Sequence, residues 1–426
     1  MLSLSICVLL IGLMLLGVPI AAAMGFTSVC LFAFLGESQN LTVMPQRIFV
    51  GTTNLTMLAI PFFILAGNLM NTGGITDRVF RFAQACCGHW PGGLAQVNIA
   101  SSVVFSGMSG AAIADAAGIG LIEMKAMTNA GFDKKFSAAI TAASATIGPV
   151  IPPSIPFVVY ASVTGVSVGA LFMAGVIPGL LMAVAMGIAV FFISRARHYP
   201  IEMKMPFRER FLAFIDAVPS LLCVAIILGG IWGGTFTPTE AAVVATAYAL
   251  VLGTIVYKEL KIKDLLQVIK VSLFQSGMTL FIIAVANFFA YFLMHQRVPN
   301  QIISALTSIT TDPTGQLMLI IGILLILGCF MEGVAVILIV TPIFMPLVIG
   351  MGMDPVQFGV VLILASMIGL LTPPVGMCLF AVSSVSNVDV ISLSIEVGPY
   401  LLGIFLVMLL AAFWPPLSLW LPSILI

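Results

Sequence analysis

Long apolar stretches separated by short polar segments dominate this chain. A membrane-spanning helix needs about 20 mostly apolar residues. Stretches of this kind predict spans at 2–35, 54–70, 170–193, 217–233, 238–257, 271–293 and 394–423. The pattern therefore predicts an all-α integral membrane protein, a polytopic helical bundle with a single membrane domain over 1–426.

The first apolar stretch could also be a secretory signal peptide, because it contains the small residues Ala21–Ala23. A signal peptide carries positive charge before its apolar run. Here the first basic residue is Arg47, and the run stays apolar as far as Leu35. We therefore expect an uncleaved membrane helix over 2–35.

Two further apolar stretches, 95–122 and 315–350, are interrupted at their centres by small and polar residues. The centres are Phe105–Gly110 and Gly328–Gly333. The arms of the first stretch, about a dozen residues each, reach only ~18 Å at ~1.5 Å per residue, short of the ~30 Å hydrocarbon core. Non-helical backbone at that depth must be buried in protein or line a wet cavity. We predict two re-entrant helical hairpins.

The basic residues predict the orientation of the chain. One cluster lies in 195–210 and another in 258–270, with two predicted spans between them, so both fall on one side. The positive-inside rule makes that side cytoplasmic. Arg78 and Arg81 precede the first hairpin, whereas no Lys or Arg follows Arg297. The two hairpins should enter the membrane from opposite faces.

Opposite hairpins predict an inverted-topology repeat, and the sequence carries one. The segment Ile147–Pro153 matches Ile368–Pro374 at an offset of 221 positions, with four of seven residues identical. At an offset of 223 the two hairpin centres also align. Each half then contains a span, an amphipathic arm, a hairpin, a broken helix and a second span.

The prolines in these matching segments predict breaks in two helices at membrane depth. Proline removes an N–H group and clashes with the carbonyl four residues earlier. The unwound backbone at 147–156 and 369–376 leaves carbonyl oxygens free, and Thr372 adds a hydroxyl. Hard cations prefer oxygen ligands, and broken helices beside hairpins are a recurring transporter device. Proline kinks with close helix packing are the simpler alternative.

Composition excludes several classes of protein. Charged residues make up 8% of the chain and apolar residues 61%, with a net charge of zero. A nucleic-acid-binding protein would need a basic face, so no nucleic acid partner is expected. The three His form no H-E-x-x-H motif, and no P-loop occurs. We therefore expect neither an enzyme nor a resident cofactor, and transport energy must come from an ion gradient or from another subunit.

Three acidic residues near the breaks and spans call for separate interpretations. Asp115, in the second arm of the first hairpin, could complement a helix N-terminus or contact substrate. Glu332 lies at the tip of the second hairpin, where ionisable residues usually have a function. Glu240 follows Thr237-Pro238-Thr239, a pattern typical of a helix N-cap.

Four motifs in this chain resemble a known family of transporters. They are Ser106-Gly107-Met108-Ser109-Gly110, Ile147-Gly148-x-x-x-Pro152-Pro153-Ser154, Gly234-Thr235-Phe236-Thr237-Pro238-Thr239-Glu240-Ala241 and Gly369-x-x-Thr372-Pro373-Pro374-x-Gly376. The chain is similar, nearly end to end, to the large membrane subunit of tripartite ATP-independent periplasmic (TRAP) transporters, the DctM-like family.

This resemblance implies a location and partners that composition alone does not reveal. The family is found in the bacterial or archaeal inner membrane and imports organic acids such as C4-dicarboxylates, sialic acid or sugar acids. A soluble periplasmic binding protein delivers the substrate, and a small four-helix membrane subunit accompanies the large one. Transport is coupled to sodium, Na⁺ being the coupling ion, and follows an elevator mechanism in which the hairpins and broken helices move as a block.

The resemblance also implies site residues. One sodium site should use Ser106 and Ser109 with backbone oxygens near Gly148, Ile151 and Pro153. The related site should use Gly328, Gly369, Thr372 and Val375. Substrate should lie between the hairpin tips, near Ser106, Gly110, Asp115, Glu332 and Gly376.

The expected organisation divides the single membrane domain into four parts. These are an N-terminal scaffold helix and loop (1–53), the first repeat (54–194), cytoplasmic basic loops with central scaffold helices (195–270), and the second repeat (271–426). Two other functions remain open. One is a stand-alone sodium-coupled dicarboxylate carrier of related hairpin architecture, and the other is an intramembrane enzyme.

Overall fold

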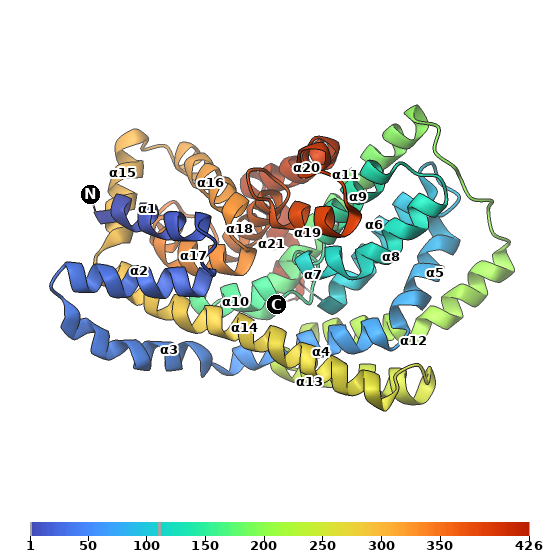
Figure 1. Cartoon of the computed structure of the whole chain (residues 1–426), viewed down its shortest axis with the longest axis horizontal. Coiled ribbons are helices and arrows are strands. Elements are labelled where there is room, and N and C mark those ends of the chain that lie inside the picture. The colour runs from blue at the N-terminus through green and yellow to red at the C-terminus, as the bar shows by residue number, and fades with distance from the viewer. Residues whose placement is uncertain (1, 110–111, 426) are drawn as a thin grey trace.

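The computed structural model describes residues 2–109 and 112–425, and every regular element within them is helical. Figure 1 shows an elongated bundle in which α14 (Ile262–His295) runs along one long side. It packs there against α2 (Ile20–Phe34), α3 (Met44–Thr52) and α4 (Ala59–Thr72). An all-α fold follows from the absence of water in a bilayer, since each helix satisfies its own backbone hydrogen bonds.

Eight helices of the described residues are long and apolar enough to cross a membrane. They are Leu55–Thr72, Val168–Ala196, Phe207–Trp232, Pro238–Val256, Ile262–His295, Pro313–Phe330, Gly333–Gly350 and Val390–Phe413. Six of them coincide with predicted spans. The other two are the arms of the second hairpin.

The N-terminal prediction was wrong in one respect. Instead of one helix over 2–35, the chain forms α1 (Leu2–Leu15) and α2, separated by a turn that contains Gly17 and Pro19. The two helices pack against each other, antiparallel, at the end of the molecule that carries the N-terminus (Figure 1). The turn has a physical cause, because Gly17 adopts φ +83° and Pro19 cannot donate a backbone hydrogen bond.

The scaffold around α14 also contains two long helices and several short connecting elements. Thr237 caps α13 (Pro238–Val251), and the predicted cap involving Glu240 is confirmed. The Glu240 carboxylate accepts from the Thr237 N–H at 2.7 Å, and the Thr237 hydroxyl accepts from the Glu240 N–H at 3.3 Å. The remaining scaffold elements are η1 (Ser38–Val43), η2 (Leu55–Leu58), α12 (Phe207–Trp232) and the π-turn η3 (Leu252–Val256).

The two repeats correspond element by element. The first consists of α4, α5 (Ile75–Cys87), α6 (Gly93–Ser109), α7 (Ala112–Ala117), α8 (Ile119–Asn129), α9 (Lys134–Ala145), α10 (Ile155–Thr164) and α11 (Val168–Ala196). The second consists of the end of α14, α15 (Val298–Ile309), α16 (Pro313–Phe330), α17 (Gly333–Gly350), α18 (Pro355–Leu370), α19 (Met377–Ser386) and α20 (Val390–Phe413), followed by α21 (Pro416–Leu425).

The positions at which helices are capped correspond between the two repeats more closely than the apolar residues do. Asp133 caps α9 and Asp354 caps α18, at an offset of 221. Gly165 and Asn387 both end a half-helix in the left-handed conformation, at an offset of 222. Turn geometry is therefore retained where the apolar residues have diverged.

Both hairpins are longer than predicted. The first runs over 93–129 and not 95–122, and its second arm is divided between α7 and α8. The arms of the second hairpin have 18 residues each, or ~27 Å at ~1.5 Å per residue. The apolar criterion ended the first hairpin at Ile122 because Glu123 follows, yet Glu123 is buried.

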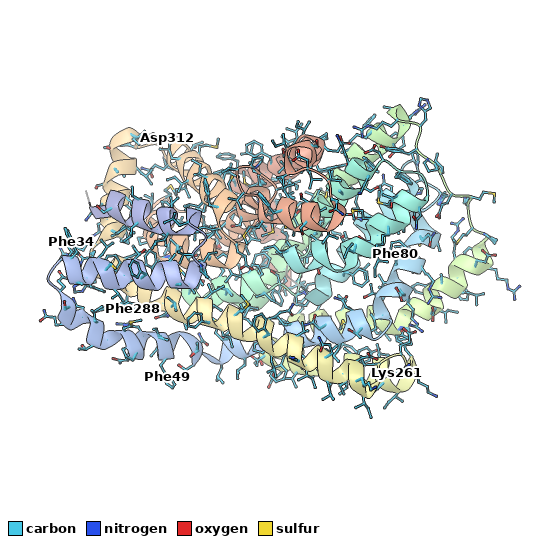
Figure 2. All side chains as sticks on the ribbon, viewed as in Figure 1. Phe34, Phe49, Phe80, Lys261, Phe288 and Asp312 are labelled. Atoms are coloured by element: carbon cyan, nitrogen blue, oxygen red, sulfur yellow. The ribbon has the colours of Figure 1, made fainter. Side chains whose placement is uncertain are left out.

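The basic loops and the acidic residue before the second hairpin lie at opposite ends of the bundle. The loop between α11 and α12 and the turn before α14 lie together at the right-hand end in Figure 1, where Figure 2 labels Lys261. Asp312, before the second hairpin, lies at the opposite end (Figure 2). This placement agrees with the sidedness that the basic residues predict.

Candidate functional site

The first broken helix unwinds between α9 and α10, and residues 146–154 of this break are all buried. Ser154 holds the unwound segment together. Its hydroxyl donates to the Pro149 carbonyl at 2.5 Å and accepts from the Phe157 N–H at 3.4 Å. The same side chain thus joins the two sides of the break and caps α10. The Pro152–Pro153 peptide bond is cis.

Helix α11 covers this break with two glycines. A Cβ on Gly175 would overlap the Val150 carbonyl oxygen, and one on Gly179 would overlap the Ile151 side chain. Close approach of the α11 backbone therefore buries the first break completely, and the predicted ligand Ile151 is 9% exposed.

Asp115 of the first hairpin lies directly against this break. Its Oδ2 is 2.9 Å from the position that a Cβ on Gly148 would occupy. Asp115 and Gly148 also line a polar cavity of about 10 Å³ together with Glu123, Thr141 and Ser144. The structure therefore brings a hairpin carboxylate and the unwound backbone of the first break together.

The second break, between α18 and α19, lies against the tip of the second hairpin. The Gly376 N–H donates to the Cys329 carbonyl at 3.1 Å. Gly328 and Gly369 touch through their backbones, because a Cβ on Gly369 would overlap the carbonyl carbon of Gly328. The Thr372 hydroxyl donates to the Ile368 carbonyl at 2.7 Å, which leaves its oxygen able to bind a cation.

The two breaks differ in exposure. Pro373 and Pro374 are exposed, whereas their counterparts Pro152 and Pro153 are buried. Ser154 corresponds to Val375, which has no hydroxyl, and the residue before α19 is instead Gly376, in the left-handed conformation with φ +59°. The second break is therefore the more open of the two.

The half-helix that follows each break packs on the hairpin of the other repeat. Helix α10, after the first break, packs on α17 of the second hairpin, and α19, after the second break, packs on α7 of the first hairpin. The fully buried thiol of Cys378 on α19 lies within electrostatic range of both Asp115 and Glu332. Each hairpin therefore contributes one acidic residue to the surroundings of the second half-helix.

Two helix N-termini in this region have no side-chain cap. Helix α17 starts after Glu332 and α19 starts after Gly376, and neither preceding side chain caps its helix. Uncapped N–H groups at a helix N-terminus bind anions readily. By contrast, the N-terminus of α10 is capped, because the Phe157 N–H donates to the Ser154 hydroxyl.

The predicted site residues fall into two groups that the structure keeps close to their own breaks. Gly148, Ile151 and Pro153 line the first break with Asp115, and Gly328, Gly369, Thr372, Val375 and Gly376 lie at the second, with Glu332 at the tip of the second hairpin. Ser106 and Ser109 end α6, but their side chains lie outside the described residues, as does Gly110.

Sequence reasoning missed a buried polar network between the first hairpin and α9. The Glu123 carboxyl and the Ser101 hydroxyl are hydrogen-bonded to each other, and Asn98 bonds Thr141 and Ser144 of α9. The signal was the i, i+3 spacing of polar residues within two apolar helices. Asn68 of α4 donates to Ser272 and Gln275 of α14 and so supports the scaffold.

A second, larger cavity lies where the scaffold meets α10 of the first repeat and α17 of the second. Its volume is about 360 Å³, and its lining includes Asn54, Met57, Ser162, Asn287 and Leu338. No charged residue lines it. Within residues 2–109 and 112–425, no group of three His, Cys, Asp or Glu is placed to hold a metal ion.

Inverted repeats, paired hairpins and two helices broken beside the hairpin tips define a multi-pass membrane protein of the transporter class. The chain belongs to the DctM component family of tripartite ATP-independent periplasmic transporters, whose family model matches residues 7–417.

Named relatives show the same membership. The chain is 41% identical to the sialic acid TRAP transporter large permease protein SiaM of Vibrio cholerae, with 97% of each chain covered. It is 36% identical to the sialic acid TRAP transporter permease protein SiaT of Haemophilus influenzae, of which it covers 67%. It is 35% identical to the C4-dicarboxylate TRAP transporter large permease protein DctM of Rhodobacter capsulatus, with 98% of each chain covered.

Solved structures share the fold at low sequence identity. The Alcanivorax borkumensis YdaH transporter superimposes with a TM-score of 0.65 at 14% identity, with 90% of each chain covered. The efflux pump MtrF of Neisseria gonorrhoeae gives a TM-score of 0.59 at 12% identity, with 88% of this chain and 84% of MtrF covered.

Proposed function

We propose that this chain is the large permease subunit of a sodium-coupled TRAP transporter that imports an organic acid across the bacterial inner membrane. The observation that carries the proposal is the packing of each half-helix on the hairpin of the other repeat, α10 on α17 and α19 on α7. The chain acts with a small four-helix membrane subunit and a periplasmic substrate-binding protein.

The charges in this region support coupling to cations. Asp115 and Glu332 are both acidic, and an organic acid substrate would add further negative charge in a place of low dielectric. Placing further negative charge beside existing acids in such a place is strongly unfavourable. Sodium ions bound near the two breaks would offset this charge, so that substrate and sodium bind more tightly together than alone.

Each sodium ion is assigned to one break. The first site uses Ser106 and Ser109 with backbone oxygens near Gly148, Ile151 and Pro153. The second site uses oxygens of Gly328, Gly369, Thr372 and Val375. Carbonyls released by the breaks are oxygen ligands of the kind that hard cations prefer.

The substrate carboxylate binds between the hairpin tips, near Ser106, Gly110, Asp115, Glu332 and Gly376. The uncapped N-termini of α17 and α19 offer backbone N–H groups to it. Relatives are named for sialic acid and for C4-dicarboxylates, so both belong to the substrate classes to be tested.

Transport follows an elevator motion in this proposal. The hairpins and broken helices move as one block against the scaffold of α3, α4, α13 and α14. The close backbone contacts within the block, such as Gly328 with Gly369, support its movement as a unit.

Reconstitution tests the function. The full chain with its small subunit in liposomes should take up radiolabelled sialic acid or succinate only with an inward sodium gradient and added binding protein. Uptake by this chain alone would instead support a stand-alone sodium-coupled dicarboxylate carrier. A thermal-shift screen of the binding protein against organic acids would first select the substrate.

A further inference from the structure

A fully buried polar network links the two arms of the first hairpin to α9. Asn98 donates to the Thr141 hydroxyl at 3.0 Å and accepts from the Ser144 hydroxyl at 2.5 Å. Ser101 bonds the Glu123 carboxyl. Glu123 is 3% exposed, and the other four residues are 0–2% exposed.

Glu123 is the residue through which α8 joins this network. Asn98 and Ser101 belong to α6, and Thr141 and Ser144 belong to α9, the helix that ends at the first break. Through the Ser101 hydroxyl and Asn98, the Glu123 carboxyl connects the second arm of the hairpin with the first arm and with α9. The Ser144 end of this connection lies four residues before Gly148.

The Ser101 hydroxyl has two oxygen neighbours but only one hydrogen, and this bears on whether Glu123 is protonated. The Ser101 hydroxyl lies within hydrogen-bond distance of the Glu123 carboxyl and, at 3.0 Å, of the Asn98 carbonyl. A hydroxyl has one hydrogen to donate. When it donates to Asn98, the contact with Glu123 is a hydrogen bond only if the carboxyl carries a proton and donates to the Ser101 oxygen.

The surroundings of Glu123 favour the protonated carboxyl. Asp115 of α7 lines the same cavity, whose volume of about 10 Å³ leaves room for no more than about one water. Lys125 on α8 and the two lysines that begin α9, Lys134 and Lys135, are exposed, and α6 carries no charged residue. Among the described residues, an ionised Glu123 would therefore be a buried charge beside a second acid, without a cation to balance it.

We propose that Glu123 remains protonated inside the membrane and that its neutral carboxyl positions the first break for ion binding. The carboxyl donates to Ser101, Ser101 donates to Asn98, and Asn98 holds α9. Glu123 is thus a positioning residue and not an ion ligand. The ion-binding part of this inference rests on the proposed sodium-coupled function, whereas the protonation does not.

Infrared spectroscopy of the full chain in lipid nanodiscs at pH 7 tests the protonation directly. The spectrum of the wild type minus that of Glu123→Gln should contain a carboxylic-acid C=O band. The exposed Glu209→Gln variant is the matched control and should remove carboxylate bands only. In Ser101→Ala the acid band should persist at higher frequency, because the carboxyl has lost its partner. Carboxylate bands alone in the Glu123→Gln difference would overturn the proposal.

Sodium-dependent uptake tests the positioning role. Glu123→Gln keeps the shape and a hydrogen-bond donor, so half-maximal uptake should need sodium within about twofold of the wild-type concentration. Ser101→Ala should raise that concentration about fivefold, the effect of one lost hydrogen bond, with a smaller change in maximal rate. Ser28→Ala, a buried scaffold serine bonded only to the Met24 carbonyl in the described residues, is the matched control and should change neither value.

The outcomes separate the two levels of inference. Loss of sodium-driven uptake in a folded Glu123→Gln variant would mean that the negative charge is required, which overturns the positioning role. Sodium-independent uptake by the wild type would instead overturn the proposed function, while the infrared band would still decide the protonation of Glu123.

Discussion

Gly328 of α16 and Gly369 of α18 are in direct backbone contact where the second hairpin meets the second break. A Cβ on Gly328 would lie 3.1 Å from the Gly369 Cα, and a Cβ on Gly369 would overlap the Gly328 backbone itself. Backbone atoms cannot rotate away as a flexible side chain can. This contact therefore fixes the distance between hairpin tip and broken helix, and with it the geometry of the second proposed ion site.

Gly369→Ala should separate the hairpin from the break. We expect a loss of about 1–3 kcal/mol in stability from overpacking and a severe loss of sodium-driven uptake. Gly322→Ala is the matched control, since Gly322 is also a helical glycine of the second repeat with nothing within 4 Å of its Cβ position. Scanning fluorimetry and liposome uptake measure both variants, and equal behaviour of the two would contradict the assigned contact.

Thr372→Ala should weaken sodium activation more than folding. We expect about a tenfold higher sodium concentration for half-maximal uptake, which corresponds to about 1.4 kcal/mol of binding energy, with little change in thermal midpoint. Thr372→Ser should retain activation because it keeps the hydroxyl.

Thr307→Ala provides the control for Thr372. The Thr307 hydroxyl makes the same bond to the carbonyl four residues earlier, at 2.9 Å, but lies on α15, away from the breaks. Unchanged sodium activation in Thr372→Ala would remove Thr372 from the proposed site.

Ser154→Ala should destabilise the first break. The variant loses the bond to Pro149 and the cap of α10, and a lost N-cap alone costs about 1 kcal/mol. Because the uncapped groups are buried, the decrease in thermal midpoint should exceed that of Ser167→Ala, an exposed N-cap of α11. Equal decreases would show that Ser154 acts only as an ordinary cap.

Arg78 should anchor the arm helix α5 to the scaffold at the end that carries the basic loops. Its guanidinium pairs with Asp216 at 3.3 Å and Glu259 at 2.8 Å and lies 3.7 Å from the centre of the Tyr257 ring. Arg78→Lys should lower stability by about 1–3 kcal/mol, because a lysine cannot reproduce these planar contacts.

Arg81→Ala is the matched control for Arg78. Arg81 pairs with the same Asp216 at 3.5 Å, but its side chain is 59% exposed, and exposed ion pairs contribute little. We expect no measurable change in thermal midpoint for Arg81→Ala. A comparable loss in both variants would show that Asp216 alone, and not the junction around Arg78, is responsible.

Sequence alone determined the class of the protein and the positions of its breaks. Apolar stretches of sufficient length predicted six of the spans, because a bilayer requires continuous apolar helix. Clustered prolines predicted where α9 and α18 end, because proline cannot continue a helix. The repeat was visible for the same reason, since Ile147–Pro153 and Ile368–Pro374 must both unwind.

Only the tertiary structure decided which helices and which distant residues contact one another. The division of 2–35 into two helices, the packing of α10 and α19 on the opposite hairpins, and the network at Glu123 depend on contacts between residues far apart in the chain. A local apolar pattern assigns Glu123 to a polar surface, because it does not contain the partners from α6 and α9 that satisfy a buried carboxyl. Hydrophobicity acts residue by residue, whereas burial of a polar group depends on which other elements pack around it.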